Sequence, residues 1–167
     1  MINNLLKLKD KDISDIIKIG FVDIEDGFAH MSFADKYLFI QFDTFFLKLT
    51  SVEQYSQLQI EITSKISFDT ELDEDLIPAQ ASIATIVLTD DMADNRINSL
   101  EIYNCIDRQD QDILCEALSI YLTCGQELFI DPTYYFGLNI GGKEQKEKWL
   151  INLSVDSTKV TSERIDL

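Results

Sequence analysis

The fold is decided by residues 21–33, Phe21-Val22-Asp23-Ile24-Glu25-Asp26-Gly27-Phe28-Ala29-His30-Met31-Ser32-Phe33. Apolar and polar residues alternate on both sides of Asp26-Gly27. An Asp-Gly pair between two alternating segments is a strong local signal for a β-hairpin. The stretch therefore predicts two antiparallel strands joined at residues 25–27.

The residues that follow continue this pattern as far as residue 65. Residues 37–42 and 44–49 are rich in aromatic and apolar side chains, and Leu58, Ile60 and Ile62 alternate with polar neighbours. We predict an antiparallel meander. By base rate, its aromatic cluster belongs to the core of a sheet and not to a cofactor site; the cluster consists of Phe39, Phe42, Phe45 and Phe46.

Two segments have apolar residues at helical spacing. Residues 10–19 predict a short amphipathic helix that ends at Gly20. Residues 107–123 predict a longer helix that ends at Gly125, and the charged residues 143–148 are a further helical candidate. The longer helix would carry one apolar stripe: Ile113, Leu114, Ala117, Leu118, Tyr121 and Leu122.

The remaining apolar segments favour strands. They are residues 82–88, 97–106, 127–130 and 134–140, and residues 149–153 resume the apolar pattern. The predicted helices are segregated from the strands and do not alternate with them, and no linker or repeat divides the chain. We expect an α+β fold: a mainly antiparallel sheet with two or three helices packed on it, in a single domain over residues 1–167.

Composition indicates an ordinary globular protein, with 46% hydrophobic and 10% aromatic residues. The sequence contains no apolar run long enough to cross a bilayer and no h-region of a secretion signal, so we expect a cytoplasmic protein without membrane contact. The cysteines are three in number and have no metal-ligand spacing. We interpret Cys105, Cys115 and Cys124 as reduced structural residues.

Charge is the most informative property of the composition. The chain has 30 acidic and 14 basic residues, a net charge of −16, which disfavours direct nucleic-acid binding. Residues 66–142 contain fifteen acids but only Arg96 and Arg108 as bases. Such a one-signed stretch can steer a basic partner toward the protein.

No arrangement of residues predicts catalysis or a bound cofactor. His30 lies in a predicted strand with no nucleophile or acid at a recognisable spacing. Residues 69–75 have the alternating oxygens of a calcium loop, but Glu74 stands where an EF-hand needs glycine. Residues 137–142 match neither a Walker loop nor a dinucleotide fingerprint. We therefore expect a protein that is not an enzyme and has neither a metal nor a cofactor.

The C-terminal half carries a resemblance to a known class of protein. It rests on Ile83 to Leu88, Asn95-Arg96-Ile97, Ile102-Tyr103-Asn104, Gly125 to Pro132, Phe136-Gly137-Leu138, Gly141-Gly142 and Trp149. These residues resemble small acidic immunity proteins encoded beside bacterial polymorphic toxins, including those of contact-dependent growth inhibition. The resemblance covers roughly residues 70–153, and it implies a cytosolic protein that binds and neutralises one cognate toxin without activity of its own.

The charge pattern and the resemblance together predict the partner and its contact residues. We expect a cognate protein toxin with a basic surface, such as a nuclease, bound by a monomer or weak dimer. The contact residues are expected in two acidic loops: Asp69, Glu71, Asp73, Glu74, Asp75, Asp90, Asp91 and Asp94. Two alternatives stay open at this point, a carboxylate-metal-dependent enzyme and an acidic adaptor or structural protein with an uncovered strand edge.

Overall fold

A computed structural model of the protein describes residues 5–67, 76–89, 94–108, 112–133, 137–155 and 160–167. The described strands form two sheets, one of eight strands and one of five. Within each sheet, every pair of neighbouring strands is antiparallel. The expected mainly antiparallel β structure with α+β character is thus confirmed. It is built from two sheets, however, and not from one.

The first sheet has the order β2-β1-β3-β4-β5-β9-β8, and β6 pairs with the other edge of β1. Its strands are β1 (Asp15–Glu25), β2 (Phe28–Phe33), β3 (Tyr37–Gln41), β4 (Phe46–Val52), β5 (Gln57–Thr63), β6 (Ile77–Ser82), β8 (Asp107–Arg108) and β9 (Asp112–Cys115).

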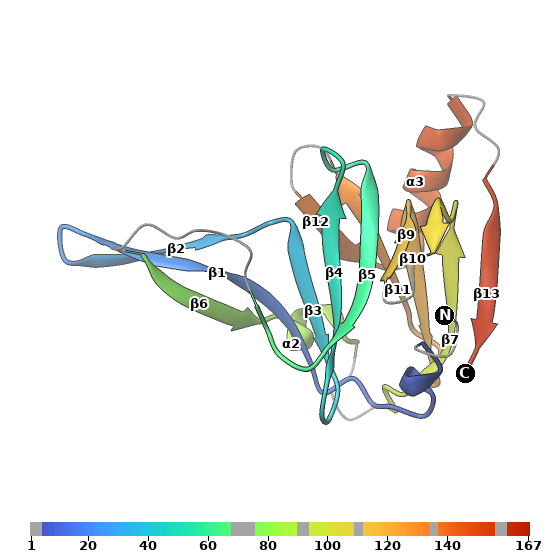
Figure 1. Ribbon diagram of the computed structural model, residues 1–167, viewed down its shortest axis with the longest axis horizontal. Helices are drawn as coiled ribbons and strands as arrows, with labels where there is room; N and C mark the ends of the chain where they lie inside the picture. The colour runs from blue at the N-terminus through green and yellow to red at the C-terminus, as the bar shows by residue number, and fades with distance from the viewer. Residues whose placement is uncertain (1–4, 68–75, 90–93, 109–111, 134–136, 156–159) are drawn as a thin grey trace.

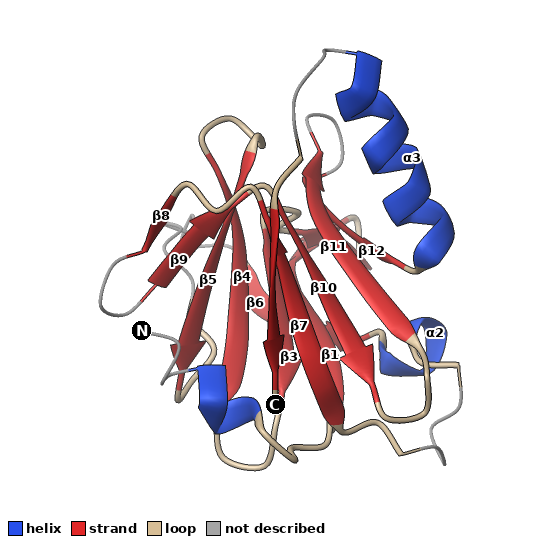
Figure 2. Ribbon diagram, turned by 90° about the vertical axis from the view of Figure 1, so that its right-hand side faces the viewer, coloured by secondary structure: helices blue, strands red, loops and turns tan. Residues whose placement is uncertain are grey.

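The second sheet has the order β12-β11-β10-β7-β13. Its strands are β7 (Ile97–Tyr103), β10 (Ala117–Leu122), β11 (Glu127–Thr133), β12 (Gly137–Gly141) and β13 (Ser162–Asp166). The helices are short except for one: the 3-10 turn η1 (Leu6–Leu8), the single turn α2 (Ala84–Val87), and α3 (Lys143–Val155). Figure 2 shows the two sheets face to face, with α3 on the outer side of the second sheet.

The core lies between the two sheets. Leu38 and Leu47 from the first sheet belong to the same buried cluster as Leu100, Leu118 and Ile120 from the second. The four aromatic residues of the meander lie where the sequence predicted. Phe39 and Phe42 are buried, Phe45 and Phe46 are partly buried, and their rings pack in pairs.

The predicted helix at residues 10–19 is wrong, because residues 15–19 belong to strand β1 and residues 10–14 are not helical. Ile16 packs into the main core, whereas Ile17 and Ile19 pack into a second cluster on the opposite face of the sheet. A strand that is buried on both faces has a near-continuous apolar sequence, and its spacing then imitates that of a helix. Gly20, the expected helix terminator, lies inside the strand.

The predicted helix at residues 107–123 is also wrong. This segment forms β8, β9 and β10, and the chain crosses from the first sheet to the second at Glu116. Ile113 and Cys115 reach the core from odd positions before that crossing, whereas Leu118 and Ile120 reach it from even positions after it, which shifts the apolar alternation. The shifted two-residue period produced the i, i+3, i+4 spacing that predicted a helix.

The other predicted elements have mixed outcomes. The hairpin and meander are confirmed as β1 to β5, residues 97–106 contain β7, and α3 confirms and extends the helical candidate at residues 143–148. Residues 82–88 are not a strand, since β6 ends at Ser82 and α2 follows. The C-terminal strand β13 was not predicted.

Three strands extend beyond the sandwich as an arm. We define the arm as residues 20–33 and 77–80, which belong to β1, β2 and β6. Figure 1 shows it projecting away from the second sheet. Among the described strands, β2 and β6 pair only with β1 within the arm, so the outer edge of each has no neighbouring strand.

We predict that Gly20→Ala disrupts the base of the arm. A methyl group on Gly20 would lie 2.0 Å from the backbone carbonyl oxygen of Ser32, and only a backbone shift can relieve that clash. We expect a loss of about 1–3 kcal/mol in the free energy of unfolding, typical of overpacking, measured by urea denaturation. Gly142→Ala is the control, because its methyl group would lie 3.4 Å from the Glu127 carbonyl oxygen. Equal stability of the two variants would contradict this account.

Candidate functional site

Only one of the predicted contact residues lies in the described part of the chain. Asp69, Glu71, Asp73, Glu74, Asp75, Asp90 and Asp91 lie outside the described residues. Asp94 is exposed and accepts a hydrogen bond of 2.8 Å from Arg96 Nε. Hydrogen bonding to Arg96 holds the pKa of Asp94 well below its usual range. This carboxylate is therefore already paired within the protein.

The described residues that flank the two acidic stretches are anchored in different places. Ile77 pairs with Val22 in the arm. Thr89 and Asp94 instead bond to Gln126 and Thr123, at the turn between β10 and β11. Between these anchors runs β6, whose residues rise by about 3.3 Å each. The two stretches thus leave the described structure at separate points.

The residues considered for nucleophilic chemistry are not assembled into a site. His30 is exposed on β2 and lies opposite Asp23 of β1. Cys115 is buried, and burial raises the pKa of its thiol far above the usual range, so it stays protonated. Within the described ranges, no three His, Cys, Asp or Glu side chains are grouped to hold a metal ion. No described helix is long and apolar enough to span a membrane.

The arm presents an apolar face that no described strand or helix covers. Successive side chains of a strand alternate between faces, so Val22 and Ile24 lie on the same face as the core residue Ile16. Cross-strand pairing adds residues of β2 and β6 to this face. Four of its large side chains are exposed, by 38–60%: Ile24, Met31, Phe33 and Ile77.

The base and tip of the arm are chemically different. At the base, Lys18 Nζ lies 5.8 Å from the ring centroid of Phe33 and 3.7 Å from Asp35. Toward the tip, residues 19–34 contain three acids and neither lysine nor arginine. Asp23 and Glu25 are exposed on β1, but they alternate with Val22 and Ile24 and therefore lie on the opposite face of the arm. The arm therefore has an exposed apolar face and, on its other face, exposed carboxylates.

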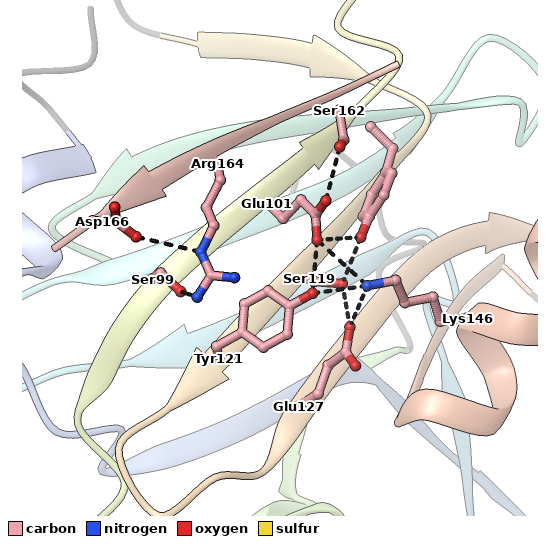
Figure 3. Close-up of polar contacts among 10 residues, drawn as sticks. Ser99, Glu101, Ser119, Tyr121, Glu127, Lys146, Ser162, Arg164 and Asp166 are labelled. Atoms are coloured by element: carbon pink, nitrogen blue, oxygen red, sulfur yellow. Dashed lines mark hydrogen bonds and ion pairs between the residues drawn. The ribbon is translucent and has the colours of Figure 1, made fainter. Parts of the chain in front are cut away.

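A second polar site lies on the outer face of the second sheet, around Lys146 of α3 (Figure 3). Lys146 Nζ lies 2.7 Å from Tyr121 Oη, 2.9 Å from Glu127 Oε1 and 3.4 Å from Glu101 Oε2. Glu101 Oε2 also accepts hydrogen bonds from Tyr103 at 2.6 Å and from Tyr121 at 2.7 Å. We call this group the Lys146 network.

Further residues of β10 and β13 close the network. Ser162 Oγ donates to Glu101 at 2.8 Å, and Ser119 Oγ donates to Glu127 at 2.7 Å. Arg164 lies 4.9 Å from the ring centroid of Tyr121. Each charged group at the centre therefore has partners from at least two other elements.

The protonation states of the network suit a structural role. Burial alone would raise the pKa of Glu101, but hydrogen bonds from Tyr103, Tyr121 and Ser162, aided by Lys146, lower it to about 2. Burial alone would lower the pKa of Lys146, but its partners raise it above the usual range. Burial and Glu101 raise the pKa of Tyr103. Lys146 and Tyr103 thus keep their protons and are poor bases or nucleophiles at neutral pH.

The network fixes α3 to the sheet. Beside it, Trp149 packs against Tyr103 and Phe129, with ring centroids 5.4 Å and 5.5 Å apart. Sequence reasoning missed this network, because its residues come from five separated elements and only the fold brings them together. It also missed the exposure of the arm, since the alternation that predicts a hairpin does not reveal which face is covered.

We predict that Glu101→Gln lowers stability at neutral pH and changes its acid dependence. The Glu101 carboxylate has a pKa of about 2 in the folded protein, below its usual value of 4.5, so its contribution to stability is present above pH 4.5 and is lost as the pH falls toward 2. We expect a loss of about 1–2 kcal/mol at pH 7, allowing for partial solvent exposure. Urea unfolding at a series of pH values measures it.

Glu147→Gln on the exposed side of α3 is the matched control. Its only described ion pair, with Lys143 at 3.9 Å, is exposed, so we expect a change of less than about 0.5 kcal/mol. The structural role fails if the gap between Glu101→Gln and the unsubstituted protein stays constant down to low pH.

Comparison of the chain with protein-family models, with curated proteins and with solved structures finds no match.

Proposed function

We propose that this protein is an immunity protein, which binds a cognate bacterial toxin in the cytoplasm and neutralises it by contact with a basic surface of that toxin. In this proposal the chain is a single domain with its helices packed on the antiparallel sheets, and it needs no cofactor. The observation that carries the proposal is the exposed apolar face of the arm, which has the exposed carboxylates of Asp23 and Glu25 on its other face.

An exposed, contiguous apolar surface with a polar rim is typical of a protein-binding site. The exposed side chains of the arm include large apolar residues, whereas the same sheet face is fully buried in the sandwich. A partner that covers the arm would remove this surface from water, at roughly 25 cal/mol per Å² of apolar area. The arm therefore supports a binding function better than a purely structural one.

Charge supports the choice of partner. The net charge of −16 and the three acids of residues 19–34 attract a basic protein and speed its association. Two copies of this chain, each with a net charge of −16, would instead repel each other. We therefore favour a basic toxin over an adaptor that associates with itself through its free strand edges.

The polar sites of the described residues support binding over catalysis. Lys146 and Tyr103 are held protonated, and the carboxylates beside them are engaged in hydrogen bonds. Such a network rigidifies the sheet that carries it. A metal-dependent enzyme draws no comparable support from these residues.

We predict that replacing apolar residues of the arm weakens toxin binding. In the double variant Ile24→Ser, Met31→Ser, the exposed positions lose apolar contact area but lie outside the core, so the fold is retained. We expect at least a tenfold loss of affinity, about 1.4 kcal/mol or more, for the product of the neighbouring reading frame. Calorimetry with the purified toxin measures it.

Ile151→Ser is the control for this variant. Ile151 is 62% exposed on α3, close to the 60% of Ile24, and it lies away from the arm. Unchanged affinity in the arm variant would remove the arm from the interface. Absence of any complex between the unsubstituted protein and that toxin would contradict the proposed function itself.

Charge reversal tests the electrostatic part separately. We expect Asp23→Lys with Glu25→Lys, and independently Asp73→Lys with Glu74→Lys and Asp75→Lys, to slow association and to reduce its dependence on salt. Stopped-flow kinetics at several ionic strengths measure both effects. Asp43→Lys with Glu53→Lys changes the net charge as much as the arm pair does, at exposed positions elsewhere. If this control slows association equally, only total charge matters and the acidic segments form no specific surface.

A further inference from the structure

A cleft of about 370 Å³ lies between α3 and the outer face of the second sheet. Asp131 of β11 and Asn139 of β12 pair directly and line it from the sheet side. On the helix side it is lined by residues at helical spacing, which therefore share one face: Gln145, Lys148, Trp149 and Asn152. A volume of this size is sufficient for a small ligand or one long side chain.

Asp131 is the unusual residue of this cleft. The residue is only 3% exposed, and Gln145 Nε2 donates to its carboxylate at 2.7 Å. Among the described residues it forms no ion pair, so its partners are neutral amides. Burial raises the pKa of Asp131, and hydrogen bonds from Gln145 and Asn139 only partly oppose this. A buried carboxylate without a cation is costly to keep ionised.

Trp149 supplies the aromatic wall of the cleft. Its indole packs against Tyr103 and Phe129, and Trp149 also lines the cleft. A cation beside an indole gains attraction from the π-electrons, and the gain increases when water is excluded. The cleft thus pairs a buried anion with an aromatic surface.

We infer that this cleft binds a guanidinium group, with Asp131 as the ion-pair partner, Trp149 as the stacking surface and the amide oxygens of the wall as further acceptors. A planar guanidinium matches a carboxylate with two parallel hydrogen bonds, stacks on aromatic rings and is less strongly hydrated than an ammonium. The negative field of the whole protein also favours a cation here. This site is independent of the proposed toxin binding, because a small guanidinium compound can occupy it without a protein partner.

Lys148 is the one lining residue that opposes a cation. It is exposed at the cleft, whereas Asp131 is buried within it. Its ammonium therefore lowers the affinity for a second cation without filling the interior. Substitution of Asp131 and substitution of Lys148 should therefore change the affinity for a cation in opposite directions.

Trp149 makes the site directly observable, because it is the only tryptophan in the chain. We expect its fluorescence to change on titration with N-acetyl-arginine amide, with a dissociation constant on the order of 1 mM for so small a ligand. N-acetyl-citrulline amide, in which a neutral urea replaces the guanidinium, should not bind in the same range. Tighter binding of the blocked arginine than of free arginine would identify a protein side chain as the natural source of the group; the reverse order would identify a small molecule.

Two variants test the residues. Asp131→Asn should lower the affinity at least tenfold, and Lys148→Gln should raise it severalfold. Affinity in the unsubstituted protein should fall as the pH is lowered through the raised pKa of Asp131, and Asp131→Asn should remove that pH dependence. Glu147→Gln, on the exposed side of the same helix, is the control.

Unfolding measurements separate a binding role from a structural one. The raised pKa of Asp131 means that its ionisation in the fold lowers stability as the pH rises through that pKa. Asp131→Asn should therefore be at least as stable as the unsubstituted protein at neutral pH, although it binds the guanidinium compound more weakly. Equal binding of the citrulline compound, unchanged affinity in Asp131→Asn, or no fluorescence response at 20 mM arginine amide, about twenty times the expected dissociation constant, would each overturn the inference.

Discussion

The structure depends on one constraint: the inner apolar face of the first sheet is longer than the second sheet that covers it. Around Ile16, Leu38 and Leu47 this face is sealed by Leu100 and Leu118 and forms the core. Beyond Gly20 the same row of side chains continues into the arm, where no strand of the second sheet lies over it (Figure 1). Apolar burial is the main source of folding free energy, so the exposed side chains of the arm do not stabilise the isolated chain as the buried part of the same face does.

The outer face of the second sheet is covered by different means. The apolar residues of α3, Lys143–Val155, do not gather on one side, so the helix has no apolar stripe with which to dock. Trp149 provides an aromatic anchor against Tyr103 and Phe129, and Lys146 provides an ionic one between Glu101 and Glu127. A helix held by such anchors is not packed closely along its whole length, which explains the cleft above Asp131.

The sequence predicted local features better than topology. The hairpin and meander followed from residues 21–63, because strict alternation and a Gly turn act within a few residues of one another. Residues 107–123 have a helical pattern but form strands, since a two-residue period that shifts near Glu116 imitates a helical one. The division into two sheets, the length of the arm and the Lys146 network depend on contacts between distant segments, such as Glu101 with Lys146. No local pattern contains that information. The acidic contact residues were predicted from the number of acids in the middle of the chain, which does not reveal where their side chains lie in the fold.

The arm and the cleft deviate from ordinary protein construction in complementary ways. In the arm, apolar side chains are exposed to water. In the cleft, the carboxylate of Asp131 is buried away from water. Each deviation lowers the stability of the isolated chain, and natural proteins keep such deviations chiefly where a ligand removes them. A cationic ligand would remove the deviation in the cleft. A partner that presents an apolar patch beside cationic groups would remove the one in the arm. A protein with a net charge of −16 attracts such groups from a distance, so the overall charge and both local deviations favour the same kind of ligand.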